Sequence, residues 1–117
     1  MINLSIKIKK NNLIDLADST HNAIGQGIYY LDYTDFYNLQ SLIKKFRFAG
    51  YQDYINPLTA NQYKKIKINL NEAISYIKLI KLDTDIYSHH YTSTIHRLLT
   101  NDIDRQLKDL QNITIIK

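Results

Sequence analysis

Tyrosines near cationic side chains form the most chemically suggestive pattern in this sequence. Six of its ten tyrosines fall between residues 29 and 54, and two lysines and an arginine lie in the same segment. The set comprises Tyr29, Tyr30, Tyr33, Tyr37, Lys44, Lys45, Arg47, Tyr51 and Tyr54. Tyrosine and arginine carry much of the binding energy at protein interfaces, so the set predicts a surface that binds a protein partner. Two other interpretations stay open: the rings could stack on single-stranded bases, or several could belong to the core with only their hydroxyls in water.

Lysines form a second set, divided between the N-terminal segment and the middle of the chain. Its members are Lys7, Lys9, Lys10, Lys64, Lys65 and Lys67. The formal net charge of +4 attracts anions, so a DNA- or RNA-binding accessory protein that holds phosphates with these lysines is the alternative function. A lysine-rich surface also follows from composition alone. Ile, Lys, Asn and Tyr are abundant and valine is missing, which fits a protein encoded by an AT-rich genome.

The histidines and acids do not form a catalytic or metal-binding set. His89 and His96 are seven residues apart, so on a helix they would share a face but lie roughly 10 Å from each other. Helical zinc sites space their histidines four residues apart, and this chain has no cysteine. Asp83-Thr84-Asp85 resembles the start of a calcium-binding loop, but the glycine and glutamate that such a loop needs do not follow. We therefore predict no catalytic residue, no metal and no cofactor. A hydrolase that pairs a histidine with an aspartate is a third hypothesis, and no nucleophile accompanies such a pair.

The longest helical pattern predicts a central helix over residues 60–82. Thr59 can cap this helix, and Gln62 stands three residues further on, as in a capping box. Apolar residues then recur at spacings of three and four on one face: Tyr63, Ile66, Leu70, Ala73, Ile77 and Ile80. At about 1.5 Å per residue such a helix would be roughly 35 Å long, so the other elements would have to pack against it.

Further helices are predicted on both sides of this one. Thr34 can cap a helix over residues 35–49, and Gly50 follows where a left-handed residue often ends a helix. Another helix is predicted over residues 86–111. A short N-terminal helix begins near Asn12 and weakens at residues 18–20. Residues 28–33 fit either a helix or a strand, and their aromatic content favours extended structure.

Strands are predicted at both ends of the chain. Isoleucine and leucine alternate with polar residues over positions 2–9, which is the period of a half-buried strand. The β-branched residues at 113–116 predict a second, shorter strand. Strands cannot leave their backbone groups unpaired in a core, so the two are expected to pair in a small sheet. The expected fold class is α+β, predominantly helical, in a single domain over residues 1–117.

Composition narrows the functional classes further. No stretch is apolar over the ~18 residues that a membrane span needs, so we expect a cytoplasmic location and no membrane partner. The expected function is that of a small non-enzymatic binding protein of the inhibitor, immunity-protein or accessory-subunit type. Its source would be a phage, a mobile element or an AT-rich bacterium, and its partner would be a protein, with nucleic acid as the alternative.

Overall fold

The computed structural model describes residues 2–27, 31–54, 62–82 and 90–116. In chain order its elements are β1 (Asn3–Lys9), the short 3-10 turn η1 (Lys10–Asn12), α1 (Leu13–Gly27), α2 (Tyr33–Tyr54), β2 (Tyr63–Asn69), α3 (Leu70–Leu82) and α4 (His90–Ile116). Most of the described residues are helical, and the two strands form one antiparallel sheet. The predicted α+β, predominantly helical fold class is confirmed.

The sheet pairs the N-terminal strand with a strand from the middle of the chain. The register runs from Asn3 opposite Asn69 to Lys9 opposite Tyr63. Leu4, Ile6 and Ile8 of β1 are buried, and so are the two isoleucines of β2, so one face of the sheet joins the core. The predicted strand over residues 2–9 is confirmed as β1, but its predicted C-terminal partner is wrong.

The predicted central helix is wrong over its first part, because residues 63–69 form β2 and the helix begins at Leu70. A reciprocal capping box sets this start. Asn69 Oδ1 accepts the backbone N–H of Glu72 at 2.7 Å, and Glu72 Oε1 accepts the N–H of Asn69 at 2.8 Å. Ile66 lies opposite Ile6 in the ladder, so strand pairing buries it as well as a helix would have done. The predicted cap Thr59 lies outside the described residues.

The predicted C-terminal strand at 113–116 is also wrong, because these residues continue α4 to Ile116. β-branched residues cost a helix only a few tenths of a kcal/mol each relative to alanine, which a long existing helix tolerates. The helix predicted over 86–111 is thus observed as His90–Ile116. The first part of that prediction, residues 86–89, lies outside the described residues.

α2 is longer than predicted at both ends. Asp32, not Thr34, caps it: Asp32 Oδ1 accepts the N–H of Asp35 at 2.8 Å, and its carbonyl accepts the N–H of Phe36 at 3.0 Å. At the other end the helix runs through Gly50 to Tyr54 instead of ending. A side chain at position 50 would collide with α1, because a Cβ there would lie 2.6 Å from Cδ1 of Ile14. Gly50 therefore permits close helix packing and does not end the helix.

α1 also continues past its predicted weak point. The helix runs without a break through residues 18–20 to Gly27. Thr20 inside it is buried, and its hydroxyl donates to the carbonyl of Leu16 at 2.6 Å. This bond satisfies the one polar group that would otherwise oppose burying that face. Of the ambiguous segment 28–33, residues 28–30 lie outside the described residues, and Tyr33 already belongs to α2.

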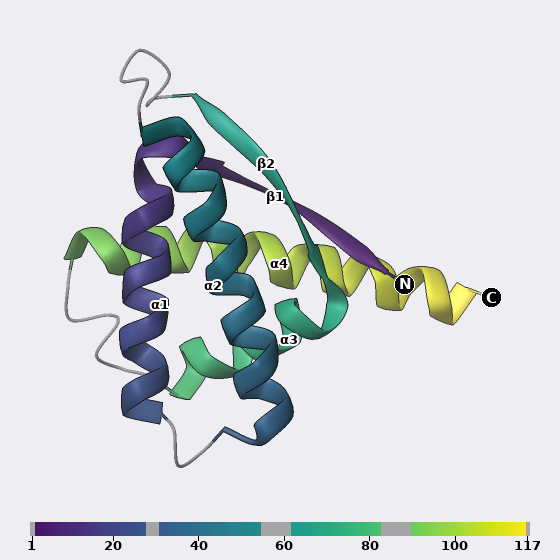
Figure 1. Ribbon diagram of the computed structural model, residues 1–117. Coiled ribbons are helices and arrows are strands. Elements are labelled where there is room, and N and C mark those ends of the chain that lie inside the picture. The colour runs from purple at the N-terminus through teal and green to yellow at the C-terminus, as the bar shows by residue number, and fades with distance from the viewer. Residues whose placement is uncertain (1, 28–30, 55–61, 83–89, 117) are drawn as a thin grey trace.

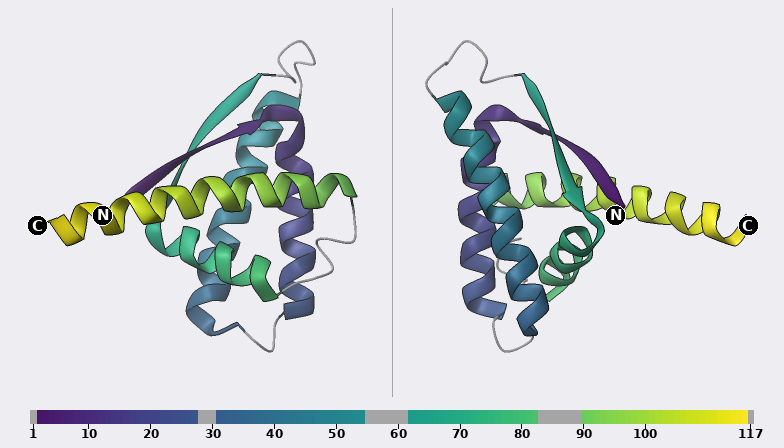
Figure 2. Two further views of the ribbon diagram at one scale, coloured as in Figure 1. Left: turned by 180° about the vertical axis from the view of Figure 1, so that it is seen from behind. Right: turned by 45° about the vertical axis from the view of Figure 1, so that its right-hand side comes forward.

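The helices surround a core on one side of the sheet. α1 and α2 stand side by side, and α3 follows β2 back against α2 (Figure 1). α4 crosses the far side of this pair and continues past β1, so that its C-terminal end projects from the body (Figure 2). The largest fully buried side chains come from both strands and from each of the helices α1 to α4: Ile6, Leu13, Leu16, Leu39, Leu42, Ile43, Phe46, Ile68, Tyr76, Leu79, Ile80 and Ile103. Of the helices that are described, none combines the length and the apolar character needed to cross a membrane.

Candidate functional site

Four exposed aromatic rings lie in a row along α2. Tyr33, Tyr37, Phe48 and Tyr51 are exposed by 92, 74, 68 and 60 %, respectively. At ~100° per residue their positions fall within about 60° of one another, and the row is roughly 27 Å long. Lys44 lies on the same side between the two pairs of rings and is exposed. We call these five residues the α2 aromatic face. Single exposed apolar residues are ordinary, but two pairs of large exposed rings on the same side of one helix are typical of an interaction surface.

The structure brings together only part of the predicted tyrosine and cation set. Tyr33, Tyr37, Lys44 and Tyr51 share the α2 aromatic face, and Phe48 is a member that the sequence analysis missed. The spacing could have identified Phe48, because on a helix it lies one turn after Lys44 and outside the buried apolar stripe.

The other members of the predicted set lie elsewhere. Lys45 and Arg47 turn toward the acids Glu72 and Asp18. Tyr29 and Tyr30 lie outside the described residues. Tyr54 ends α2, and its side chain is not among those described.

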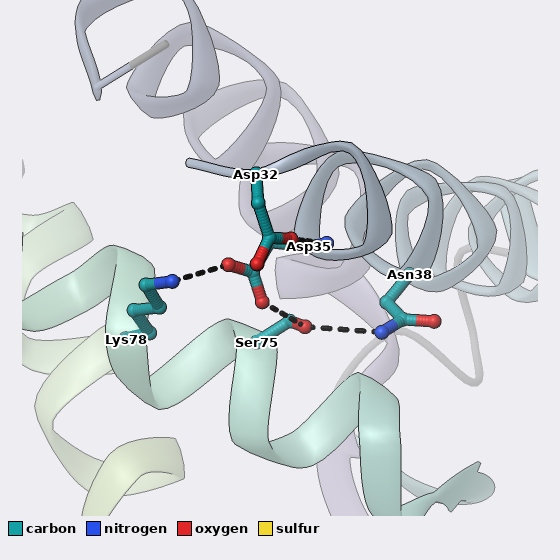
Figure 3. Close-up of polar contacts among 5 residues, drawn as sticks. All are labelled: Asp32, Asp35, Asn38, Ser75 and Lys78. Carbon is teal, nitrogen blue, oxygen red and sulfur yellow. Dashed lines mark hydrogen bonds and ion pairs between the residues drawn. The ribbon is translucent and has the colours of Figure 1, made fainter. Parts of the chain in front are cut away.

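A polar network fixes the end of α2 that carries Tyr33 and Tyr37 (Figure 3). Asp35 Oδ2 pairs with Lys78 Nζ of α3 at 2.5 Å, and Asp35 Oδ1 accepts the hydroxyl of Ser75 at 2.9 Å. Asn38 in turn donates to the Ser75 hydroxyl at 3.2 Å. Burial opposes ionisation of Asp35, but the hydrogen bonds from Lys78 and Ser75 outweigh it, so the pKa of Asp35 is lowered. The carboxylate thus stays charged and ties the first turns of α2 to α3.

A second ion pair holds the middle of α2 against α3. Glu72 is fully buried, and its Oε1 accepts both the backbone N–H of Asn69 and the ammonium of Lys45, the latter at 2.5 Å. Lys45 is adjacent to Lys44 but points to the other side of the helix. The α2 aromatic face is therefore presented by a helix that is tied to α3 at two places.

The sheet displays the second predicted set. The register places Lys7 opposite Lys65 and Lys9 opposite Tyr63 on the outer face, with Lys67 further along β2. We call Lys7, Lys9, Lys65 and Lys67 the sheet lysine face. The remaining two lysines of the set are not on it, because Lys64 lies on the opposite side of β2 and Lys10 lies in η1.

A groove of about 830 Å³ separates the sheet lysine face from α4. Its walls carry Lys7, Lys9 and Lys65 from the sheet and Ile95, Leu98 and Arg105 from α4. Tyr63 also lines it, and the ammonium of Lys9 lies 5.8 Å from the centre of the Tyr63 ring. This distance is that of a cation–π contact. The groove combines cationic walls with apolar patches.

His96 is the buried polar centre of the fold. Its Nε2 lies 2.7 Å from the hydroxyl of Ser19 in α1, and its Nδ1 bonds the hydroxyl of Tyr76 in α3. Each ring nitrogen thus has a hydroxyl partner, and a hydroxyl can donate to the unprotonated nitrogen of a neutral imidazole or accept from the protonated one. Burial lowers the pKa of His96 to about 4, so the ring is neutral. With no exposed surface, this imidazole joins three helices and does not face solvent.

The remaining histidines and the acids form no candidate metal site among the described residues. His21 is exposed on α1, His89 lies outside the described residues, and His90 begins α4. In the part of the chain that the structure describes, no three His, Cys, Asp or Glu side chains are grouped closely enough to hold a metal ion.

Comparisons with protein-family models, with curated proteins and with solved structures gave no match for this chain. The α2 aromatic face and the groove beside the sheet lysine face are therefore the two candidate functional surfaces of the described residues.

Proposed function

We propose that this chain is a non-enzymatic binding protein that associates with a partner protein through the α2 aromatic face. The observation that carries the proposal is the row of four exposed rings on one side of one helix. The small size and the composition typical of an AT-rich genome favour an inhibitor, immunity protein or accessory subunit. Its source would be a phage, a mobile element or a bacterium with such a genome, and its place of action the cytoplasm.

The exposed ring area is large enough to form the centre of an interface. An aromatic side chain offers about 150–250 Å² for burial, so the four rings, at their exposures, present roughly 450–700 Å². A standard interface buries about 800 Å² on each partner. The rings alone would thus supply more than half of one side, and the polar residues beside them would form the rim.

The way α2 is held favours binding by rings that are already in position. The Asp35–Lys78 pair and the Lys45–Glu72 pair tie this helix to α3. A partner would therefore not have to order the helix before the rings make contact, and binding loses less conformational entropy. Tyrosine and phenylalanine have few rotatable bonds, which lowers that loss further.

The face also indicates the chemistry of the partner. Two pairs of rings flank the single cation Lys44, so the matching surface would be an apolar groove or helix with an acidic side chain near its centre. Such a carboxylate would be desolvated together with Lys44, and the charge would fix the register of the helix in its binding site.

Paired variants and affinity capture test this proposal. Tyr37→Ser/Phe48→Ser removes two rings of the α2 aromatic face, and Tyr63→Ser removes an equally exposed ring from the sheet. The proposal is supported if the wild type and Tyr63→Ser both capture the same partner protein from the source cell and the double variant does not. Retention of that protein by the double variant, with folding verified by circular dichroism, refutes it. Sedimentation of the purified chain identifies the case in which the partner is a second copy.

A further inference from the structure

The sheet lysine face holds like charges in direct opposition. Lys7 and Lys65 are cross-strand partners, both exposed, and Lys9 and Lys67 stand next to them on the same face. Like charges opposite each other destabilise a strand pair. Among the residues that the structure describes, Lys7, Lys65 and Lys67 have no salt bridge to an acid. The charge of this face is thus uncompensated within the described fold.

Protection of a free strand edge does not fully account for the charges on β1. Lysines often prevent one sheet from pairing with another along an exposed edge. Part of the outer edge of β1, however, is already held by α4, where the side-chain amide of Gln106 donates to the carbonyl of Ser5 at 2.9 Å. Edge protection therefore accounts for only part of the charge on β1, and a ligand is the better explanation for lysines that line a groove.

The groove beside these lysines has the size and the chemistry of a binding site. Its volume of about 830 Å³ lies within the usual range for ligand sites, about 300–1,000 Å³. The acid in its wall, Asp102, is engaged by Arg105 at 2.5 Å and by Gln106 at 3.3 Å. On the apolar side, Leu98 and Tyr63 are each more than half exposed to solvent, although both could have been buried. Cations next to exposed apolar and aromatic surface fit a ligand that carries both phosphates and planar rings.

We infer that this groove binds single-stranded nucleic acid, with phosphates on Lys7, Lys9 and Lys65 and a base stacked on Tyr63. Residues two apart on a strand are separated by about 6.8 Å, so Lys7 and Lys9 form a short row that an extended backbone can follow. Aromatic side chains stack on bases of any sequence, and Tyr63 stands at the end of that row. Lys67 extends the positive face beyond the groove, along β2.

The position of α4 favours a single strand over a duplex. A free two-stranded ribbon can enter the major groove of DNA, which is about 12 Å wide. Here α4 lies along the outer edge of β1 and would have to enter the groove together with the ribbon. In a duplex, moreover, the bases are stacked inside and cannot reach Tyr63. A single strand meets neither obstacle.

The test measures binding of fluorescent oligothymidylate and oligouridylate to the full chain at ~50 and ~200 mM salt. Each phosphate contact on a single strand contributes about −0.7 to the slope of log K against log salt. Four contacts, from Lys7, Lys9 and Lys65 in the groove and from Lys67 beside it, predict that affinity falls about fifty-fold between the two salts. Lys7→Gln/Lys65→Gln removes two of them, so its affinity should fall only about seven-fold over the same range and should be weaker at both salts.

Matched variants separate the groove from the overall charge. Lys81→Gln/Lys108→Gln makes the same change in net charge at exposed positions on α3 and α4 that do not line the groove, and it should alter affinity less than two-fold. Tyr63→Ala should weaken binding roughly 5- to 150-fold through loss of stacking, whereas Tyr63→Phe should retain it. These outcomes together support the groove.

Several results would overturn the inference. Equal weakening by both lysine pairs would show binding to overall charge, and lack of binding at ~50 mM salt would show that the groove takes no nucleic acid. Equal or tighter binding to a duplex, to polyglutamate or to anionic lipid vesicles would assign another occupant. The site is separate from the proposed protein interface: Tyr37→Ser/Phe48→Ser should bind oligonucleotide like the wild type, so each proposal can fail without the other.

Discussion

Acid should destabilise this fold through His96. The ring is buried between α1, α3 and α4 and bonds Ser19 on one nitrogen and Tyr76 on the other. Burial lowers its pKa from 6.5 to about 4 in the folded chain, whereas unfolding exposes the ring to water. Between these two values the unfolded chain takes up a proton that the folded chain does not, so protons favour unfolding.

The sign and the size of the effect follow from these two pKa values. Above pH 6.5 the ring is neutral in both states, and its contribution to stability is fully present. The contribution is lost as the pH falls from 6.5 to about 4, and below that value the folded chain is protonated too. At 1.36 kcal/mol per pKa unit the full loss is about 3 kcal/mol. A domain of this size is stable by about 5–15 kcal/mol, so the loss is readily measured.

The assay is urea unfolding, followed by circular dichroism, at a series of pH values from 7 to 4. His96→Gln removes the titrating group and introduces an amide that can both donate and accept a hydrogen bond. Between pH 7 and 4 the free energy of unfolding of this variant should change by about 3 kcal/mol less than that of the wild type. His96→Leu is the second variant if the amide fits poorly. Ile103→Val, which trims a buried residue by one methyl group, should lower stability by about 1 kcal/mol at every pH and keep the wild-type slope. Identical slopes for wild type and His96→Gln would refute the assignment of the acid sensitivity to His96.

Two other substitutions test the helix packing. Gly50→Ala places a methyl group 2.6 Å from Cδ1 of Ile14, so an overpacking cost of about 1–3 kcal/mol should outweigh the gain of up to about 1 kcal/mol in helix propensity. Thermal unfolding at a lower temperature is expected, and a higher one would contradict the close packing. Lys45→Met leaves the buried Glu72 carboxylate without its cation and should lower the free energy of unfolding by about 2 kcal/mol. This loss is smaller than that expected for a fully buried pair, because Lys45 is partly exposed. Lys44→Met is the matched control at the neighbouring position and should change stability by under about 0.5 kcal/mol; equal effects would exclude the Glu72 pair as the cause.

The parts of the fold that the sequence predicted correctly are those with an unambiguous local period. The alternation of apolar and polar residues over positions 2–9 fits a strand and not a helix, and the predicted strand is confirmed as β1. The fold class and the existence of a helix in each of the regions 35–49, 70–82 and 90–111 follow in the same way. Helix ends were less certain because they depend on contacts at a distance. Gly50 resembles a helix terminator locally, and only the approach of Ile14 in α1 explains a glycine inside α2.

β2 was missed because its residues satisfy two periods at once. Tyr63, Ile66 and Leu70 fit a helical stripe, and only Ile66 and Ile68 show the alternation of a strand. Pairing with β1 decides between the two periods, because β1 needs a hydrogen-bonded neighbouring strand and residues 63–69 provide it. One local signal did mark the boundary: Glu72 is the only glutamate in the chain and stands three residues after Asn69, the spacing of a capping box.

Most members of the α2 aromatic face were predicted, but their alignment was not, because the helix predicted over residues 35–49 reached neither Tyr33 nor Tyr51. Tyr33, Tyr37 and Tyr51 lie at helical spacings from Lys44, and any helix through this segment exposes them together. The pairing of Lys45 with Glu72 and of Arg47 with Asp18 could not be predicted, because these acids are far away in the sequence. Local charge patterns cannot show which cations a fold will use internally.

The groove could not be predicted from the sequence, because it depends on which period residues 63–69 adopt. On a helix, Lys64 and Lys67 would share a face and Lys65 would point elsewhere. On a strand, Lys65 and Lys67 share a face and Lys64 takes the opposite one. The change from helix to strand therefore replaces one pair of lysines with another. Antiparallel pairing then sets Lys65 against Lys7, which is 58 positions earlier in the chain. Two lysine runs that are unrelated in the sequence become one charged face, and only then does the wall formed by α4 make that face one side of a binding groove.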